Sequence, residues 1–389
     1  MLNLSIWRFG EAYDRTYLPP PLLHYLAYYA VLGWEIQRTI MASSEEDAAA
    51  EQLGSMSLGE SAERAKDNET EHDEAPAKFC SACETKSDTL MKCRACKCVW
   101  YCDKDCQNKH WKEHKKECKL IKKELDKRGG KLDVGTELDI GPVGKLPPRE
   151  ECPICMRALP IHESLLVYFP CCGKTICGGC DHQHQLKNSD QAGPHTCAFC
   201  RTAMPGSDKE TLARAIKRVE LKDPEALHSM AMGYGEGECG LPVDQAKSID
   251  LMRQSADLNN AVSQYQLGNY YDDGEMGLER NEAEALKYWK KAAGGGHCFA
   301  QHNLGNAEYQ NGEYSAAMRH WRLSASGGFK NSLNNVIFSF EEGLLHHGGL
   351  AETLQAFYCS RAEMKSVDRD RYIEHLKETG EYREENHDY

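Results

Sequence analysis

Sixteen of the chain's 19 cysteines lie between Cys80 and Cys200, and most of them form Cys-x2-Cys pairs. Two residues between paired thiols allow one tight turn to direct both sulfurs at a tetrahedral ion about 2.3 Å away. The alternative is a disulfide framework, which requires an oxidising compartment and rarely repeats this spacing. The cysteine pattern therefore predicts small zinc-dependent modules.

The cysteines form two successive sets, and each set is spaced to hold two zinc ions, so we expect about four ions in all. The first set consists of Cys80, Cys83, Cys93, Cys96, Cys102, Cys106, His114 and Cys118. The second set consists of Cys152, Cys155, Cys171, Cys172, Cys177, Cys180, Cys197 and Cys200. Neither set leaves an open coordination position, so the sequence predicts structural zinc and no zinc-activated hydrolysis.

Two histidines could supply the nitrogen ligand of the first set. His114 precedes Cys118 by four residues, so both would lie on one face of a helix. His110, four residues earlier, is the alternative ligand. Cys98 is left over in this region, and we interpret it as a bystander thiol.

The length and net charge of the chain limit the classes of protein to which it can belong. A chain of 389 residues is long enough for about two to four domains. A net charge of −13 argues against a general nucleic-acid binder, and no segment reaches the roughly 18 apolar residues that span a membrane. Because the thiols must stay reduced to bind metal, we expect an intracellular protein, cytoplasmic or nuclear.

Three segments read as extensions or linkers. Residues 1–42 are expected to be an N-terminal extension. Its apolar run 22–34 is a signal-like segment, or it lies upstream of the actual translation start, which would then be Met41. Residues 43–76 are small, polar and acidic, which predicts a disordered linker. Residues 119–150 are expected to be a second linker because glycine and proline pairs punctuate them.

After Pro205 the chain becomes periodic. Met230, Leu267 and Leu304 follow one another at steps of 37 residues, and apolar residues recur at helical spacing within each unit. The spacing predicts two antiparallel helices per unit, which stack into a solenoid over residues 210–366. The polar residues 367–389 are expected to form a cap and a tail.

The first set, over residues 78–118, resembles the MYND-type zinc finger, and the repeats resemble the Sel-one-like branch of the tetratricopeptide superfamily. The finger's cross-braced pattern implies that Cys80, Cys83, Cys102 and Cys106 hold one ion, while Cys93, Cys96, His114 and Cys118 hold the other. The resemblance also implies docking of short proline-containing peptides.

The second set, over residues 151–206, resembles a RING-type finger, with two departures: Ala198 stands where the family has a proline, and the other departure concerns a zinc ligand. Lys174 stands where the family has a zinc-binding histidine. Cys152, Cys155, Cys177 and Cys180 are assigned to one ion. The other ion rests on Cys172, Cys197 and Cys200, and its fourth ligand is Cys171 or one of His182, His184 and His195.

Two hypotheses on function follow. The fold class is multi-domain: two small cross-braced zinc fingers (α+β, stabilised by metal) followed by an all-α helical-repeat solenoid. The first hypothesis is a zinc-binding adaptor for protein–protein interactions. The alternative is a RING-type ubiquitin-protein ligase, in which Ile154 and Arg201 would dock a ubiquitin-charged conjugating enzyme. Lysine methylation is excluded because nothing in the chain resembles a methyltransferase catalytic domain.

Overall fold

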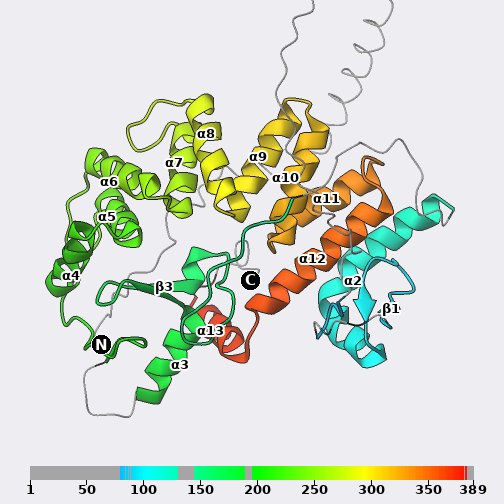
Figure 1. Cartoon of the computed structure of the whole chain (residues 1–389), viewed down its shortest axis with the longest axis horizontal. Coiled ribbons are helices and arrows are strands. Elements are labelled where there is room, and N and C mark those ends of the chain that lie inside the picture. The colour runs from blue at the N-terminus through cyan, green and yellow to red at the C-terminus, as the bar shows by residue number, and fades with distance from the viewer. Residues whose placement is uncertain are drawn as a thin grey trace, which may run out of the picture. The chain divides into compact units, whose positions relative to one another are not determined.

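The structure, a computed structural model, describes residues 79–129 apart from Glu84, Lys86 and Asp88, then 144–188, 195–380 and Tyr382. The predicted N-terminal extension and acidic linker lie outside the described residues. The described part contains two small cysteine-rich modules and an array of paired helices (Figure 1). None of its helices is long and apolar enough to cross a membrane.

The first cysteine-rich module (residues 79–129) combines a short hairpin with a long helix. Its elements are β1 (Met91–Lys92), β2 (Trp100–Tyr101) and α2 (Lys104–Lys127). The strands pair antiparallel, with Met91 opposite Tyr101. The helix begins at Asp103, whose carboxylate accepts a 2.8 Å hydrogen bond from the backbone N–H of Cys106.

The helix α2 extends beyond the expected end of the module. Residues 119–127, predicted to be part of a linker, continue the helix. The helix continues because Ile121 and Leu125 are buried in a core that also contains residues of α10, α11 and α12. A helix with one buried apolar face gains more from packing than an unstructured linker would.

The second cysteine-rich module (residues 151–206) is built around another hairpin and a short helix. Its elements are a 3₁₀ turn (Glu163–Leu165), β3 (Leu166–Phe169), β4 (Lys174–Cys177) and α3 (Gly178–Asn188). The strands pair antiparallel, with Leu166 opposite Cys177. Val167, Phe169 and Ile176 form its small core together with three buried cysteines, Cys152, Cys177 and Cys197, and their neighbours.

The rest of the described chain is helical. The helices are α4 (Asp208–Glu220), α5 (Pro224–Glu236), α6 (Gln245–Asp257), α7 (Ala261–Asp273), α8 (Glu282–Gly294), α9 (Cys298–Gln310), α10 (Tyr314–Ser326), α11 (Lys330–Glu341), α12 (His347–Met364) and α13 (Val367–Glu378). The starts of α5, α7 and α9 are spaced at the predicted 37 residues. The unit that begins with α9 is shorter, because α11 starts at Lys330.

A glycine on one helix and a tryptophan on the next explain how the pairs α7–α8 and α9–α10 pack. Trp289 of α8 lies against α7 at Gly268, where an added Cβ would come within 2.3 Å of the Trp289 ring. Trp321 and Gly305 repeat this arrangement, at 2.4 Å. The indole N–H of Trp289 donates a 3.0 Å hydrogen bond to the side-chain oxygen of Asn269, so the buried ring has no unsatisfied donor.

The C-terminal helix α13 does not simply end the array. Residues from 367 onward were expected to be a cap and tail, but α13 packs against α3 of the second module (Figure 1). Gly178 and Gly179 permit this approach, since a Cβ on Gly178 would lie 2.1 Å from the Tyr372 ring. The array therefore contacts both cysteine-rich modules.

Candidate metal centres

The structure brings the predicted ligands together in four groups, each with four donor atoms within 4.8 Å of one another. Site 1 is Cys80, Cys83, Cys102 and Cys106; site 2 is Cys93, Cys96, His114 and Cys118; site 3 is Cys152, Cys155, Cys177 and Cys180; site 4 is Cys171, Cys172, Cys197 and Cys200. Four sulfur and nitrogen donors are the usual set of a closed structural zinc site.

The sulfur separations test whether these groups fit zinc. A tetrahedral ion with Zn–S bonds of about 2.3 Å holds its sulfurs about 3.8 Å apart. The Cys93 and Cys118 sulfurs are 3.7 Å apart, and those of Cys155 and Cys177 are 3.9 Å apart. One pair of sulfurs in site 2 and one pair in site 3 thus stand at the spacing that the ion requires.

Site 1 joins the start of the first module to the start of α2. The Cys83 sulfur lies 3.5 Å from that of Cys102 and 3.7 Å from that of Cys106. A hydrogen bond with the Thr85 hydroxyl lowers the pKa of the Cys83 thiol to about 6. Since the thiolate is the form that binds metal, this contact favours ligation at neutral pH.

Site 2 is buried and uses His114. The His114 Nε2 atom lies 3.2 Å from the Cys96 sulfur, while its Nδ1 atom lies 3.4 Å from the hydroxyl of Tyr358 on α12. His110, the alternative ligand, instead places Nδ1 3.0 Å from the Tyr101 hydroxyl. The structure groups His114, and not His110, with the three cysteines.

Cys98 lies outside the four groups but is not isolated. It is fully buried, with its sulfur 3.1 Å from Nε2 of His347 on α12. The same nitrogen lies 2.9 Å from the backbone oxygen of Cys96, a residue of site 2. Cys98 therefore connects the first module to the array, a role that its local sequence does not signal.

An arginine of the C-terminal helix α13 contacts Cys155 of site 3. An Nη atom of Arg369 on α13 lies 3.5 Å from the Cys155 sulfur, and the other donates a 2.7 Å hydrogen bond to the Ala158 backbone oxygen. Arg369 is buried. Residues around a metal site orient its ligands, and sequence reasoning missed this one because it is 214 residues from Cys155.

Site 4 contains the two adjacent cysteines. The Cys171 sulfur lies 3.4 Å from that of Cys200, and the Cys172 sulfur lies 4.0 Å from that of Cys197. Gly173, in a left-handed conformation with φ of 67°, turns the chain directly after the pair. The turn allows both thiols to enter one group.

The three histidines proposed as substitutes in site 4 are not in this group. His184 places Nε2 3.0 Å from the Thr196 backbone oxygen and Nδ1 2.8 Å from Arg201. His182 stacks on His375 of α13, with ring centroids 4.6 Å apart. His195 is exposed.

Three of the cysteine turns share one backbone geometry. Lys97, Met156 and Arg201 each follow the second cysteine of a pair, and their φ angles are 59°, 56° and 64°. Each donates its N–H to the carbonyl of the first cysteine, as Arg201 does to Cys197 at 3.0 Å. The shared turn directs the paired sulfurs to one point.

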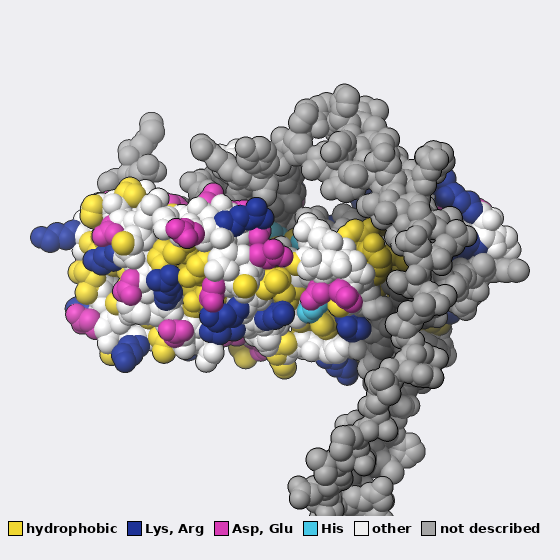
Figure 2. Space-filling view, turned by 90° about the horizontal axis from the view of Figure 1, so that it is seen from above, with side chains coloured by type: hydrophobic (Ala, Val, Ile, Leu, Met, Phe, Trp, Pro, Cys, Tyr) yellow, Lys and Arg dark blue, Asp and Glu magenta, His cyan; other side chains and the backbone are white. Residues whose placement is uncertain are grey.

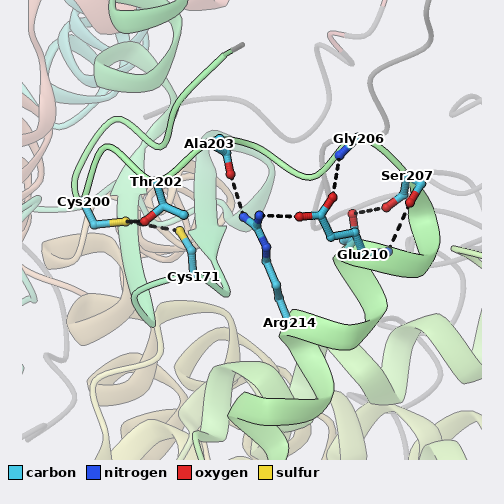
Figure 3. A network of polar contacts seen from close by, with 9 residues as sticks. Cys171, Cys200, Thr202, Ala203, Gly206, Ser207, Glu210 and Arg214 are labelled. Carbon is cyan, nitrogen blue, oxygen red and sulfur yellow. Dashed lines mark hydrogen bonds and ion pairs between the residues drawn. The ribbon is translucent and has the colours of Figure 1, made fainter.

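The array also holds the last turn of the second module (Figure 3). Arg214 of α4 donates a 2.8 Å hydrogen bond to the Ala203 backbone oxygen and a 2.7 Å bond to Glu210. Glu210 in turn accepts the N–H of Gly206 at 3.1 Å. Another arginine of α4, Arg218, donates to the backbone oxygen of the site 4 residue Cys171 at 3.2 Å.

Comparison with known families agrees with this geometry for two of the parts. Residues 80–118 match the MYND finger, and residues 224–260, 261–297 and 298–329 match the Sel1 repeat. The chain contains a MYND finger and Sel1 repeats. These two resemblances, inferred from the sequence, are confirmed, and the cysteine and histidine clusters indicate that the protein binds zinc.

Similar curated proteins share only a short stretch with this chain. "Histone-lysine N-methyltransferase ASHR1" of Arabidopsis thaliana is 48% identical over 50 residues, which are 13% of this chain and 10% of that protein. "Histone-lysine N-methyltransferase SMYD3" of Homo sapiens is 42% identical over 43 residues, 11% of this chain and 10% of that protein. The chain thus spans about a tenth of each of these relatives.

Solved structures of Sel1-type proteins are also similar in part. A Sel1 repeat protein from Oxalobacter formigenes has 23% identity and a TM-score of 0.30, covering 32% of this chain and 96% of its own. The protective antigen c5321 of uropathogenic Escherichia coli has 17% identity and a TM-score of 0.35, covering 52% of this chain and 46% of its own.

Proposed function

We propose that this protein is a zinc-binding adaptor that assembles protein partners on one frame made of the MYND finger, the second module and the Sel1 repeats. The observation that carries this proposal is that each metal group is closed by four protein donors and that its surroundings contact the helical array. Closed sites hold a fold together and leave no position for a substrate. We propose four zinc ions, one in each group.

The MYND finger is proposed to dock short proline-containing peptides. Exposed apolar side chains are candidate contacts, and on this module Met91 is 48% and Trp111 is 38% exposed. Trp111 lies on α2, inside the matched residues 80–118. An exposed indole suits proline rings because it offers a large apolar face at a low cost in conformational entropy.

The experiment is a binding assay of zinc-loaded protein against a panel of fluorescent proline-containing peptides. Trp111→Ala is expected to weaken the best peptide at least about tenfold, which is about 1.4 kcal/mol. Leu120→Ala is the matched control, because Leu120 is exposed on the same helix but outside the matched residues. Equal losses in both variants, or no bound peptide in the panel, would contradict the docking role.

A second candidate function, a RING-type ubiquitin ligase, has one observation in its favour. Ile154 and Phe199 lie on two cysteine turns of the second module and are 41% and 40% exposed, although the module packs against α4 and α13 elsewhere. Arg201, the proposed cationic contact, is exposed too. These residues would be available to a ubiquitin-charged conjugating enzyme.

Self-ubiquitination with a panel of conjugating enzymes tests this candidate. Ile154→Ala should abolish ubiquitin chains, whereas the control Leu186→Ala, an exposed apolar residue on α3, should leave them unchanged. Protein that carries zinc but forms no chains with any enzyme of the panel would eliminate the ligase. Only about a tenth of the length of each methyltransferase relative is similar to this chain, so we do not propose methyl transfer.

Partners other than proteins are not proposed. The net charge is −13, and the face shown in Figure 2 carries acidic, basic and apolar side chains side by side. A surface of this kind suits protein contacts better than the phosphate backbone of a nucleic acid.

A further inference from the structure

A short stretch before the second module, residues 144–149, lies along the Sel1 array. It carries the sequence Gly-Lys-Leu-Pro-Pro-Arg and has no helix or strand. Leu146 and Arg149 are half-buried, while Lys145, Pro147 and Pro148 are exposed. A Pro-Pro pair favours the polyproline II conformation, which has three residues per turn, so residues three apart point to the same side.

Both half-buried residues contact the same corner of the array, the turn between α10 and α11. A Cβ on Gly327 would lie 2.8 Å from Leu146 Cδ1, so the absence of a side chain at Gly327 makes room for the leucine. Arg149 donates a hydrogen bond to the backbone oxygen of Gly327 and lies 2.8 Å from the Met364 sulfur. Leucine and arginine therefore anchor the segment.

Pro147 contacts the neighbouring repeat in a related way. A Cβ on Gly296, which follows α8, would lie 2.8 Å from Pro147 Cγ. Both glycines lie directly after the second helix of a Sel1 unit: Gly327 is the C-cap of α10, and Gly296 follows the C-cap of α8. The segment thus crosses two consecutive repeats at positions where glycine leaves space.

The segment does not fill the space beside it. A cavity of about 690 Å³ opens between residues 144–149 and the helices α10 and α12, within the size range of ligand-binding clefts. Glu363 of α12 lines it together with the basic Lys145 and Arg149, while Glu352, also in the lining, pairs with Arg322 of α10 at 2.9 Å. A segment that leaves such a space unfilled can be exchanged for another segment.

We infer that this part of the Sel1 array is a peptide-binding groove for extended, proline-containing basic segments of the type Leu-Pro-Pro-Arg, and that residues 144–149 occupy it as an internal ligand. A partner that carries such a segment must displace them. The inference deepens the proposed adaptor function by naming what the repeats bind, and it concerns a surface other than the MYND finger.

A fluorescent peptide with the sequence of residues 144–151 tests this groove in the full-length, zinc-loaded protein. The tethered segment competes at an effective concentration of about 1 mM, so binding to the wild type should be weak. The double variant Leu146→Ser with Arg149→Ser frees the groove and is expected to bind the peptide at least tenfold more tightly. A peptide with alanine in place of its arginine should bind neither protein.

Three results decide the outcome. Tighter binding to the double variant supports the inference. Equal binding to both proteins, or none to the variant, overturns it. If the double variant loses zinc or helical circular dichroism, Pro147→Gly is measured in its place under the same criteria, because it removes the proline ring beside Gly296 and loosens the segment while both anchors stay in place. The MYND finger is assayed separately through Trp111→Ala, so failure of the groove and failure of the finger remain distinguishable.

Discussion

Arg369, close to the C-terminus, lies 3.5 Å from the sulfur of Cys155 in the second module. The contact joins a proposed metal ligand to a helix that the local cysteine pattern does not include. Its guanidinium also donates to the backbone oxygens of Ala158 and Met364. The C-terminal helix therefore belongs to the surroundings of site 3.

We expect Arg369→Ala to destabilise the protein by about 2–4 kcal/mol, because it leaves buried acceptors without their donor. Zinc should leave the second module faster, as measured by the rate of transfer to a chromophoric chelator. Arg371→Ala is the control, since Arg371 is mostly exposed and pairs with Asp368 of its own helix, at 3.6 Å. Unchanged zinc transfer in Arg369→Ala would show that the contact has no role at the site.

A second prediction concerns Gly268 and Gly305, which contact the rings of Trp289 and Trp321. Gly268→Ala and Gly305→Ala should each lower the free energy of unfolding by about 1–3 kcal/mol, because the added methyl group overlaps a buried indole. Chemical denaturation followed by circular dichroism measures the loss. Gly294→Ala is the control, since a Cβ there meets nothing within 4 Å; a loss as large as the others would contradict the steric explanation.

Metal removal should affect more than the cysteine-rich modules. We expect about four zinc ions per chain by elemental analysis, each contributing on the order of 10 kcal/mol to folding. A strong chelator should unfold the MYND finger and increase hydrogen exchange in α11 and α12, which share its core. Fewer than four ions, or unchanged exchange in these helices, would contradict the proposed sites and the shared core.

Acid should weaken the first Sel1 unit. His228 is buried, with Nδ1 2.9 Å from the Ser263 hydroxyl, and burial lowers its pKa to about 4 from an unfolded value near 6.5. The unfolded state therefore binds more protons between these values, so stability falls as the pH decreases through this window. At pH 5 the loss from His228 alone should be about 2 kcal/mol.

The control for this prediction is His228→Gln, which cannot titrate. Urea unfolding at pH 7 and at pH 5 gives the stability change of each protein, and the difference between them isolates His228 from the acid sensitivity of the thiolates. Identical changes in wild type and variant would mean that His228 does not contribute.

The predictable parts of this fold are those with local signals. The spacing of Met230, Leu267 and Leu304 indicates the repeats because each Sel1 unit contains the same helix pair. The cysteine pairs indicate their groups because one tight turn presents two thiols. For site 4 the sequence offered Cys171 and three histidines as alternatives for the fourth ligand. The turn at Gly173 brings Cys171 into the group.

The contacts between modules and array have no such signal. Tyr358 is 244 residues from His114, and His347 is 249 residues from Cys98. Tyrosine and histidine on a helix such as α12 have many roles, and only the packing of distant segments selects this one. For the same reason, the sequence does not indicate that α2 continues to Lys127 or that α13 packs on α3.

The second module touches α4 near one end of the array, through Arg218, and α13 at the other, through Arg369. Most repeat arrays can gain or lose a unit during evolution because each unit contacts only its neighbours. Here a duplicated or deleted unit would separate or misalign the two arginines, and the module could no longer contact both. The second module therefore constrains how many units can lie between α4 and α13.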